Sequence, residues 1–64
     1  MTNEQANEQA AFHEGWHAGA LGIAAETPRQ VAETHPTFSD GEITCYLNGA
    51  EDGARGDRTR LYGC

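Results

Sequence analysis

Apolar residues recur at three- and four-residue intervals along two stretches of the chain, which is the spacing of one face of a helix. The clearest stretch places five residues on a single apolar face: Ile43, Tyr46, Leu47, Ala50 and Ala54. An earlier stretch gathers a second face in the same way, from Phe12, Gly15, Trp16, Gly19 and Ile23. No segment alternates in the manner of a credible strand. The pattern therefore predicts an all-α protein with two long helices.

Each predicted helix has a start signal of the capping-box type, in which a Ser or Thr is followed three residues later by Glu or Gln. The three boxes pair Thr2 with Gln5, Thr27 with Gln30 and Ser39 with Glu42. Pro28 suits the first position of a short middle helix, and Pro36 disfavours helix at the residue before it. We predict helices over about residues 3–25, 28–34 and 40–55, followed by an irregular tail at 57–64.

The glycines form an internal echo. Six of the eight lie in two segments that begin 34 residues apart and share the spacing aromatic-x-x-Gly-x-x-x-Gly-x-x-Gly, namely FHEGWHAGALG at 12–22 and YLNGAEDGARG at 46–56. Glycines four residues apart let two helix backbones approach closely, as in the small-xxx-small motif of membrane helices. We predict a small antiparallel helical hairpin that crosses at these glycines, bridged by the short middle helix.

The size of the chain limits its core. Its 64 residues form one domain at most, spanning 1–64, and a domain of this size buries only about 60% of its unfolded surface. The large core candidates are few: Phe12, Trp16, Leu21, Ile23, Val31, Phe38, Ile43, Tyr46, Leu47, Leu61 and Tyr62. This set suits a small helical core that is completed by a target or by a second copy of the chain, so a homodimer stays open.

Charge is distributed unevenly along the chain. Residues 1–54 hold nine acids and one arginine, a net charge of −8, and residues 55–64 hold three arginines and one acid, a net charge of +2, which together give −6. Binding to nucleic acid requires a basic face that displaces counterions from phosphates. Only the tail segment RGDRTR offers one, so direct nucleic-acid binding by the body is not expected. A basic surface on another protein or nucleoprotein complex is the expected partner.

The segment AFHEGWHAGALG at 11–22, with Phe12 followed by Gly15-Trp16-His17-Ala18-Gly19-Ala20-Leu21-Gly22, resembles the first helix of the ribosome modulation factor family. The segment YLNGA at 46–50 is similar to that family's second helix in Leu47 and Gly49. The resemblance covers about 25 residues and implies two helices packed through glycine-containing faces. It also implies an alternative function as a ribosome-associated hibernation factor, in which Arg55, Arg58 and Arg60 would reach RNA. The family is strongly basic, whereas this chain is acidic and contains no lysine.

The segment HEGWH at 13–17 fits the H-E-x-x-H pattern of zinc hydrolases. On a helix His13 and His17 are one turn apart and can reach one metal ion, with Glu14 beside a bound water. A catalytic zinc also requires a third protein ligand, and none of the candidates lies at a recognised spacing: Glu26, Glu33, His35 and Cys45. We interpret the segment as a helix surface and expect no cofactor, with a zinc site on His13 and His17 as an alternative.

The remaining sequence features concern the compartment. No apolar run approaches the ~20 residues of a membrane span, and the polar start MTNEQANEQ does not resemble a signal peptide. The cytoplasm is therefore the expected location, where Cys45 and Cys64 are expected to be free thiols.

We interpret the chain as a small acidic binding protein without catalytic activity. It is expected to modulate or inhibit a larger complex that handles nucleic acid, which would suit a bacterial or phage-encoded inhibitor, including one that acts against a host defence complex. Carboxylates would face basic residues of the target, and an aromatic side chain would anchor the contact. The predicted partner-binding residues are Glu14, Trp16, Glu42, Tyr46, Glu51, Asp52 and Tyr62.

Overall fold

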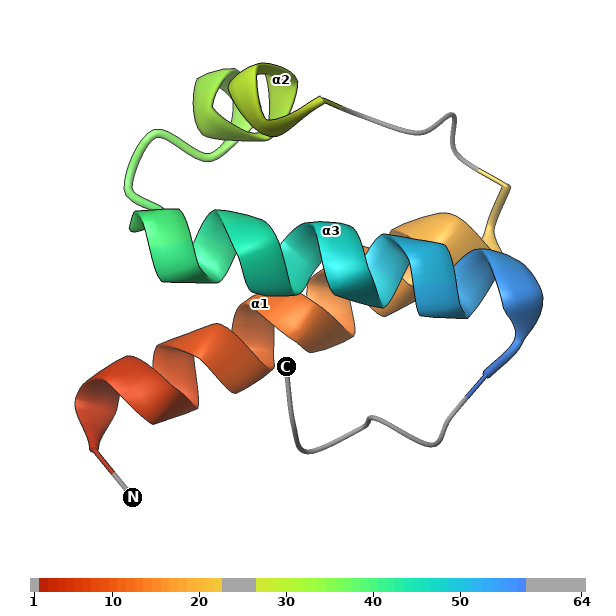
Figure 1. The fold of residues 1–64 in the computed structure, drawn as a ribbon, viewed down its shortest axis with the longest axis horizontal. Coiled ribbons are helices and arrows are strands. Elements are labelled where there is room, and N and C mark those ends of the chain that lie inside the picture. The colour runs from red at the N-terminus through yellow and green to blue at the C-terminus, as the bar shows by residue number, and fades with distance from the viewer. Residues whose placement is uncertain (1, 23–26, 58–64) are drawn as a thin grey trace.

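The computed structural model describes residues 2–22 and 27–57, and this part of the chain is all-helical, as the apolar pattern predicts (Figure 1). α1 covers Asn3–Ala20, α2 covers Pro28–Thr34 and α3 covers Asp40–Arg55. None of these helices combines the length and the apolar composition that crossing a membrane requires. From residue 58 onward, the predicted irregular tail lies outside the described residues.

All three predicted capping boxes form. At the start of α3, the backbone N–H of Glu42 donates to Ser39 Oγ at 3.3 Å, and the backbone N–H of Ser39 donates to Glu42 Oε1 at 3.1 Å. Thr2 and Thr27 cap α1 and α2 with the same reciprocal pair of hydrogen bonds. Each box satisfies two backbone donors that the first turn of a helix leaves without an intrahelical partner, which explains why the three helix starts were predictable from the sequence.

α1 is shorter than the sequence predicts, because it ends at Ala20 and does not continue to about residue 25. Leu21 is its C-cap, and Gly22 follows with a φ of 79°. This is the left-handed region, which glycine adopts without the steric penalty of a side chain and which commonly terminates helices. Gly56 ends α3 in the same way with a φ of 70°. The third glycine of each echo segment is therefore a helix stop.

α1 and α3 run in the same direction, so the predicted antiparallel orientation is wrong (Figure 1). The two helices begin together, since Ser39 Oγ donates to Glu4 Oε1 at 3.1 Å. They also end together, since the indole Nε1 of Trp16 donates to the backbone carbonyl of Asp57 at 2.7 Å. Short loops make neighbouring helices antiparallel. Here the connection between α1 and α3 includes α2, so α3 can begin beside the start of α1.

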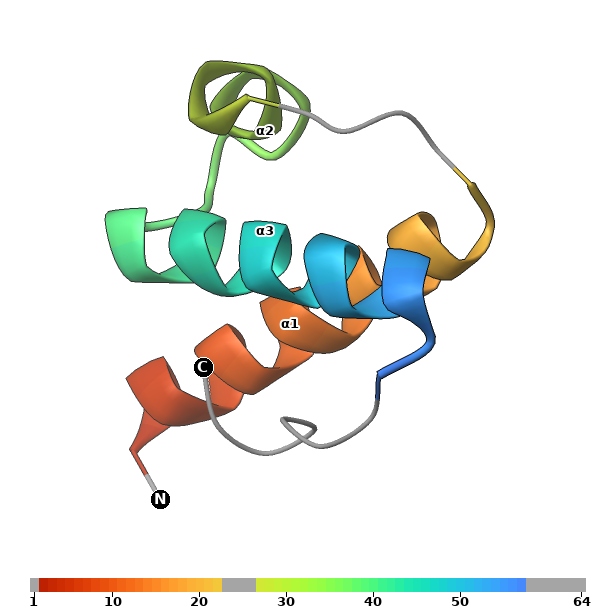
Figure 2. The same cartoon turned by 45° about the vertical axis from the view of Figure 1, so that its right-hand side comes forward.

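α3 occupies the middle of the fold, with α1 on one side and α2 on the other (Figure 2). The centre of the core takes one residue from each helix: Ala11, Val31 and Tyr46, which are at most 5% exposed. Phe38, Ile43 and Leu47 are partly buried against this centre. Leu21 was expected in the core but is 80% exposed, because it lies just beyond the end of α1.

Candidate functional site

The crossing of α1 and α3 is built on four glycines, as predicted. In its first layer Gly15 faces the backbone of Tyr46, and a Cβ atom on Gly15 would lie 2.8 Å from the carbonyl carbon of Tyr46. Gly49 faces the backbone of Phe12, and its Cβ atom would lie 3.0 Å from the carbonyl carbon of Phe12. Real Cβ atoms are excluded from such positions, so only glycine permits this approach.

The second layer of the crossing repeats the first, one turn further along both helices. Gly19 faces the backbone of Ala50, and Gly53 faces the backbone of Trp16; in each case a Cβ atom would lie 2.8 Å from the carbonyl carbon. Adding 34 to the residue numbers of α1, and subtracting 34 from those of α3, exchanges the two contacts of each layer. The sequence echo is therefore a local pseudo-two-fold relationship between the two parallel helices.

The predicted partner-binding residues do not form one surface. Glu14 and Glu51 are exposed, and Glu42 and Trp16 are partly buried. Tyr46 is 5% exposed and belongs to the core, and Asp52 is 0% exposed. Tyr62 lies outside the described residues. Tyr46 and Asp52 therefore hold the fold together in this structure, and partner binding by the remaining residues stays a prediction.

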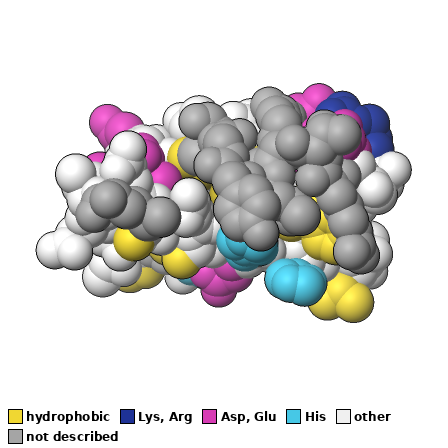
Figure 3. Space-filling model, turned by 90° about the horizontal axis from the view of Figure 1, so that it is seen from below, with side chains coloured by type: hydrophobic (Ala, Val, Ile, Leu, Met, Phe, Trp, Pro, Cys, Tyr) yellow, Lys and Arg dark blue, Asp and Glu magenta, His cyan; other side chains and the backbone are white. Residues whose placement is uncertain are grey.

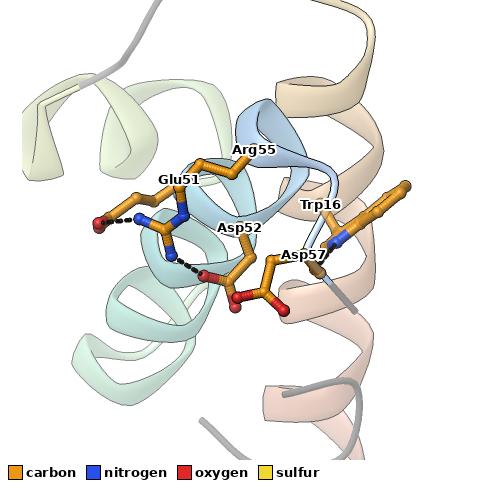
Figure 4. A network of polar contacts seen from close by, with 5 residues as sticks. All are labelled: Trp16, Glu51, Asp52, Arg55 and Asp57. Carbon is orange, nitrogen blue, oxygen red and sulfur yellow. Dashed lines mark hydrogen bonds and ion pairs between the residues drawn. The ribbon is translucent and has the colours of Figure 1, made fainter. Parts of the chain in front are cut away.

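Asp52 belongs to a polar network at the C-terminal end of α3 (Figure 4). Arg55 donates to Asp52 Oδ1 and to Glu51 Oε1, each at 2.8 Å. The backbone N–H of Asp57 donates to the carbonyl of Asp52 at 2.9 Å, and the carbonyl of Asp57 accepts the Trp16 indole bond. The network joins the end of α3 to α1, so Trp16 and Asp52 serve the crossing. The spacing of these residues gave no signal of this role.

At the opposite end of the crossing, carboxylates gather from two helices. Glu4 and Glu8 of α1 lie against the first turn of α3: Glu4 accepts the bond from Ser39, and Glu8 Oε2 lies closest to the position of a Cβ atom on Gly41. The acidic residues of that first turn are Asp40 and Glu42. We call Glu4, Glu8, Asp40 and Glu42 the acidic end. Sequence reasoning missed Glu4, Glu8 and Asp40 because parallel packing was not foreseen.

The acidic end differs in its ion pairing from Glu33, Glu51 and Asp52. Arg29 pairs with Glu33 on α2, and Arg55 pairs with Glu51 and Asp52 on α3. Within residues 2–22 and 27–57, no carboxylate of the acidic end has an ion-pair partner. Figure 3 shows acidic side chains toward the left of one face, and arginine atoms together with acidic ones at the right.

Within the HEGWH segment His13, Glu14 and His17 are exposed, whereas Gly15 and Trp16 lie at the crossing with α3. Within the described part of the chain, no three His, Cys, Asp or Glu side chains are placed to hold one metal ion. His35 instead stacks on Phe38, with ring centroids 4.4 Å apart and an interplanar angle of 6°. Glu26 lies outside the described residues. The described residues thus supply two neighbouring imidazoles, without the third ligand that a catalytic zinc requires.

Two further predictions concern cysteine and the arginine tail. Cys45 is 4% exposed and disulfide-bonded, so the expected free thiol is wrong for this residue. Disulfides persist in oxidising compartments, whereas the prediction of a free thiol assumed the reducing conditions of the cytoplasm. Cys64, Arg58 and Arg60 lie outside the described residues.

Comparisons of this chain with family models, with curated proteins and with solved structures found no match.

Proposed function

We propose that the protein is a non-catalytic binding protein whose acidic end contacts a basic surface of a larger complex. The observation that carries this proposal is the pairing pattern: both described arginines form ion pairs away from the acidic end. No described arginine therefore neutralises the carboxylates of the acidic end, and their negative potential can attract an external cation. A surface of one sign attracts a surface of opposite sign and accelerates its association.

The geometry of the acidic end suits contact with lysine or arginine side chains. Glu4 and Asp40 are exposed, and Glu8 and Glu42 are partly buried, so both inner and outer carboxylates are present. The hydrogen bonds of Glu4 to Ser39 and of Glu42 to the Ser39 backbone fix two of the four side chains. Carboxylates that are already ordered lose less side-chain entropy on binding. Proteins that handle nucleic acid present basic surfaces of this kind, which makes them the proposed target class.

The test is affinity capture from a lysate of the source organism, followed by a binding assay with the purified partner. Glu4→Gln combined with Glu8→Gln removes two charges from the acidic end and leaves the capping boxes intact. Glu33→Gln is the control, because it removes a carboxylate of the same type on α2. The double variant is expected to lower the association rate at low salt by about tenfold.

The Glu33→Gln control is expected to change the association rate by no more than about twofold to threefold. Circular dichroism should show the same helicity for all three proteins. Equal association rates for the double variant, the control and the unmodified protein would refute the acidic end as the contact surface. Capture of a partner lacking any basic patch would refute the target class.

The ribosome is a second candidate target, favoured by the glycine-packed pair of helices, which is the arrangement that the family resemblance implies. In this case the arginines of the tail would contact RNA, and binding would depend on these arginines and not on the acidic end. Sedimentation with ribosomal particles that is lost on Arg58→Glu with Arg60→Glu, and kept on Glu4→Gln with Glu8→Gln, would favour this candidate. The reverse result would favour the acidic end.

A further inference from the structure

His13 and His17 lie one turn apart on the exposed side of a regular helix. Residues at i and i+4 of a helix have Cβ atoms about 5–6 Å apart and project side by side. The opposite side of α1 is occupied by the crossing, where Phe12 and Gly15 are buried. The two imidazoles are therefore adjacent to each other, open to solvent and separate from the packing that holds the fold together.

The rings of both histidines are positioned by the aromatic residue that precedes each. The His13 ring meets Phe12 edge-on at 6.4 Å between centroids, and the His17 ring meets Trp16 edge-on at 5.8 Å. Neither ring has a hydrogen bond or an ion pair with any residue that the structure describes. The imidazole nitrogens thus remain available to an external ligand.

We propose that His13 and His17 together chelate a divalent first-row transition-metal ion. Neutral imidazole is a common protein ligand for Zn²⁺, Ni²⁺ and Cu²⁺, and affinities for such nitrogen sites rise to Cu²⁺. Two imidazoles from one helix form a chelate, which binds the ion more tightly than either imidazole alone. Glu14 is exposed on the same helix, but it is not a ligand of the proposed site, because no third ligand converges with the histidines in the described chain.

The two-ligand site leaves coordination positions open on the ion. These positions are filled either by water or by the same pair of histidines from a second copy of the chain. Zn²⁺ prefers four ligands in tetrahedral geometry, which two copies with two imidazoles each would provide. The inference does not depend on the acidic end, because His13 and His17 lie on α1 outside the set of residues that defines it.

The structure supplies a direct readout for this site. Trp16 is the only tryptophan in the chain, and its ring lies beside that of His17. Cu²⁺ or Ni²⁺ bound at His17 is therefore expected to quench tryptophan fluorescence. Untagged protein would be titrated with CuCl₂ and with NiCl₂, and the affinity and stoichiometry for Zn²⁺ would be measured by calorimetry. Mass measurement of the zinc-bound protein in solution would show whether water or a second copy completes the coordination.

His13→Ala and His17→Ala are each expected to weaken metal binding by at least about tenfold. Removing a residue that only supports a metal ligand already lowers metal affinity by about 10–100-fold. Glu14→Gln is the matched control and should change the affinity by less than about threefold. Both histidines are exposed, so the variants should keep the helicity of the unmodified protein. The proposal is overturned if either alanine variant binds as tightly as the unmodified protein, or if Cu²⁺ binds without quenching Trp16.

Discussion

Gly53 packs its backbone directly against the carbonyl group of Trp16, at a separation that excludes any side chain on residue 53. The equivalent contact on the other helix is that of Gly19 with Ala50. Since the obstructing atoms are backbone atoms, no change of rotamer can relieve a clash at either position. The separation of the two long helices is therefore set by the absence of a methyl group.

Gly53→Ala is expected to destabilise the protein by roughly 2 kcal/mol or more, although alanine is the better helix former by about 1 kcal/mol. A methyl group at this position forces α1 and α3 apart and weakens the packing of the whole crossing. The measurement is urea unfolding followed by circular dichroism, compared with the unmodified protein at the same protein concentration.

Gly41→Ala is the matched control, because it is the same substitution in the same helix. The atom nearest to a Cβ on Gly41 is Glu8 Oε2, at the flexible end of a side chain that can move aside. We expect a change between zero and about 1 kcal/mol of stabilisation, which reflects helix propensity. If both substitutions have the same effect, the close approach at Gly53 does not limit stability.

Arg55 and Arg29 provide a second matched comparison. Both form ion pairs within one helix, but Arg55 reaches Asp52, whose side chain is 0% exposed, while Arg29 and Glu33 are 90% and 66% exposed. Exposed pairs contribute about 0–1 kcal/mol, whereas removing one ion-pair contact from a buried charge costs more. Since Arg55 itself is 53% exposed, we expect Arg55→Ala to cost about 1–2 kcal/mol and Arg29→Ala less than about 0.5 kcal/mol.

Urea unfolding at low salt checks this comparison, and the Arg55 variant should keep its deficit at high salt because its carboxylate partner is buried. A deficit of equal size for the two arginine variants would show that burial of Asp52 has no energetic consequence.

The helix starts could be predicted from the sequence because each capping box is a local signal, complete within four residues. The glycine crossing was predictable as well, since the spacing of Gly15 and Gly19 matches that of Gly49 and Gly53. The direction of the helices was not. The same spacing permits parallel and antiparallel crossings. The relative direction of α1 and α3 depends instead on the connection between them, which includes α2.

The acidic end illustrates why the candidate site was harder to predict than the fold. Glu4 and Glu8 are separated from Asp40 by more than thirty residues, and only a parallel crossing brings them together. Asp52 was expected on the surface because charged residues are almost never fully buried without a partner. Arg55, which pairs with it, is three residues away, and this spacing alone does not distinguish a buried pair from an exposed one.

Trp16 connects α1 to the residue that follows the C-cap of α3. Trp16→Phe keeps an aromatic ring at this position and removes the indole N–H that donates to the Asp57 carbonyl. The loss of one partly buried hydrogen bond is expected to cost about 1–2 kcal/mol. Urea unfolding monitored by circular dichroism measures this change. His17→Ala, at the neighbouring exposed position, is the control and should lie within about 0.5 kcal/mol of the unmodified protein.

Cys45 tests how far this small fold depends on a covalent bond. It is 4% exposed within α3 and disulfide-bonded. A disulfide contributes about 2–4 kcal/mol to the free energy of unfolding. A reducing agent is therefore expected to lower the urea midpoint of the unmodified protein. Cys45→Ala should have the lower midpoint from the start and should not respond to the reducing agent. Peptide mapping of the non-reduced protein would identify the bonded partner, and an unmodified protein that alkylates at Cys45 without reduction would contradict the bond.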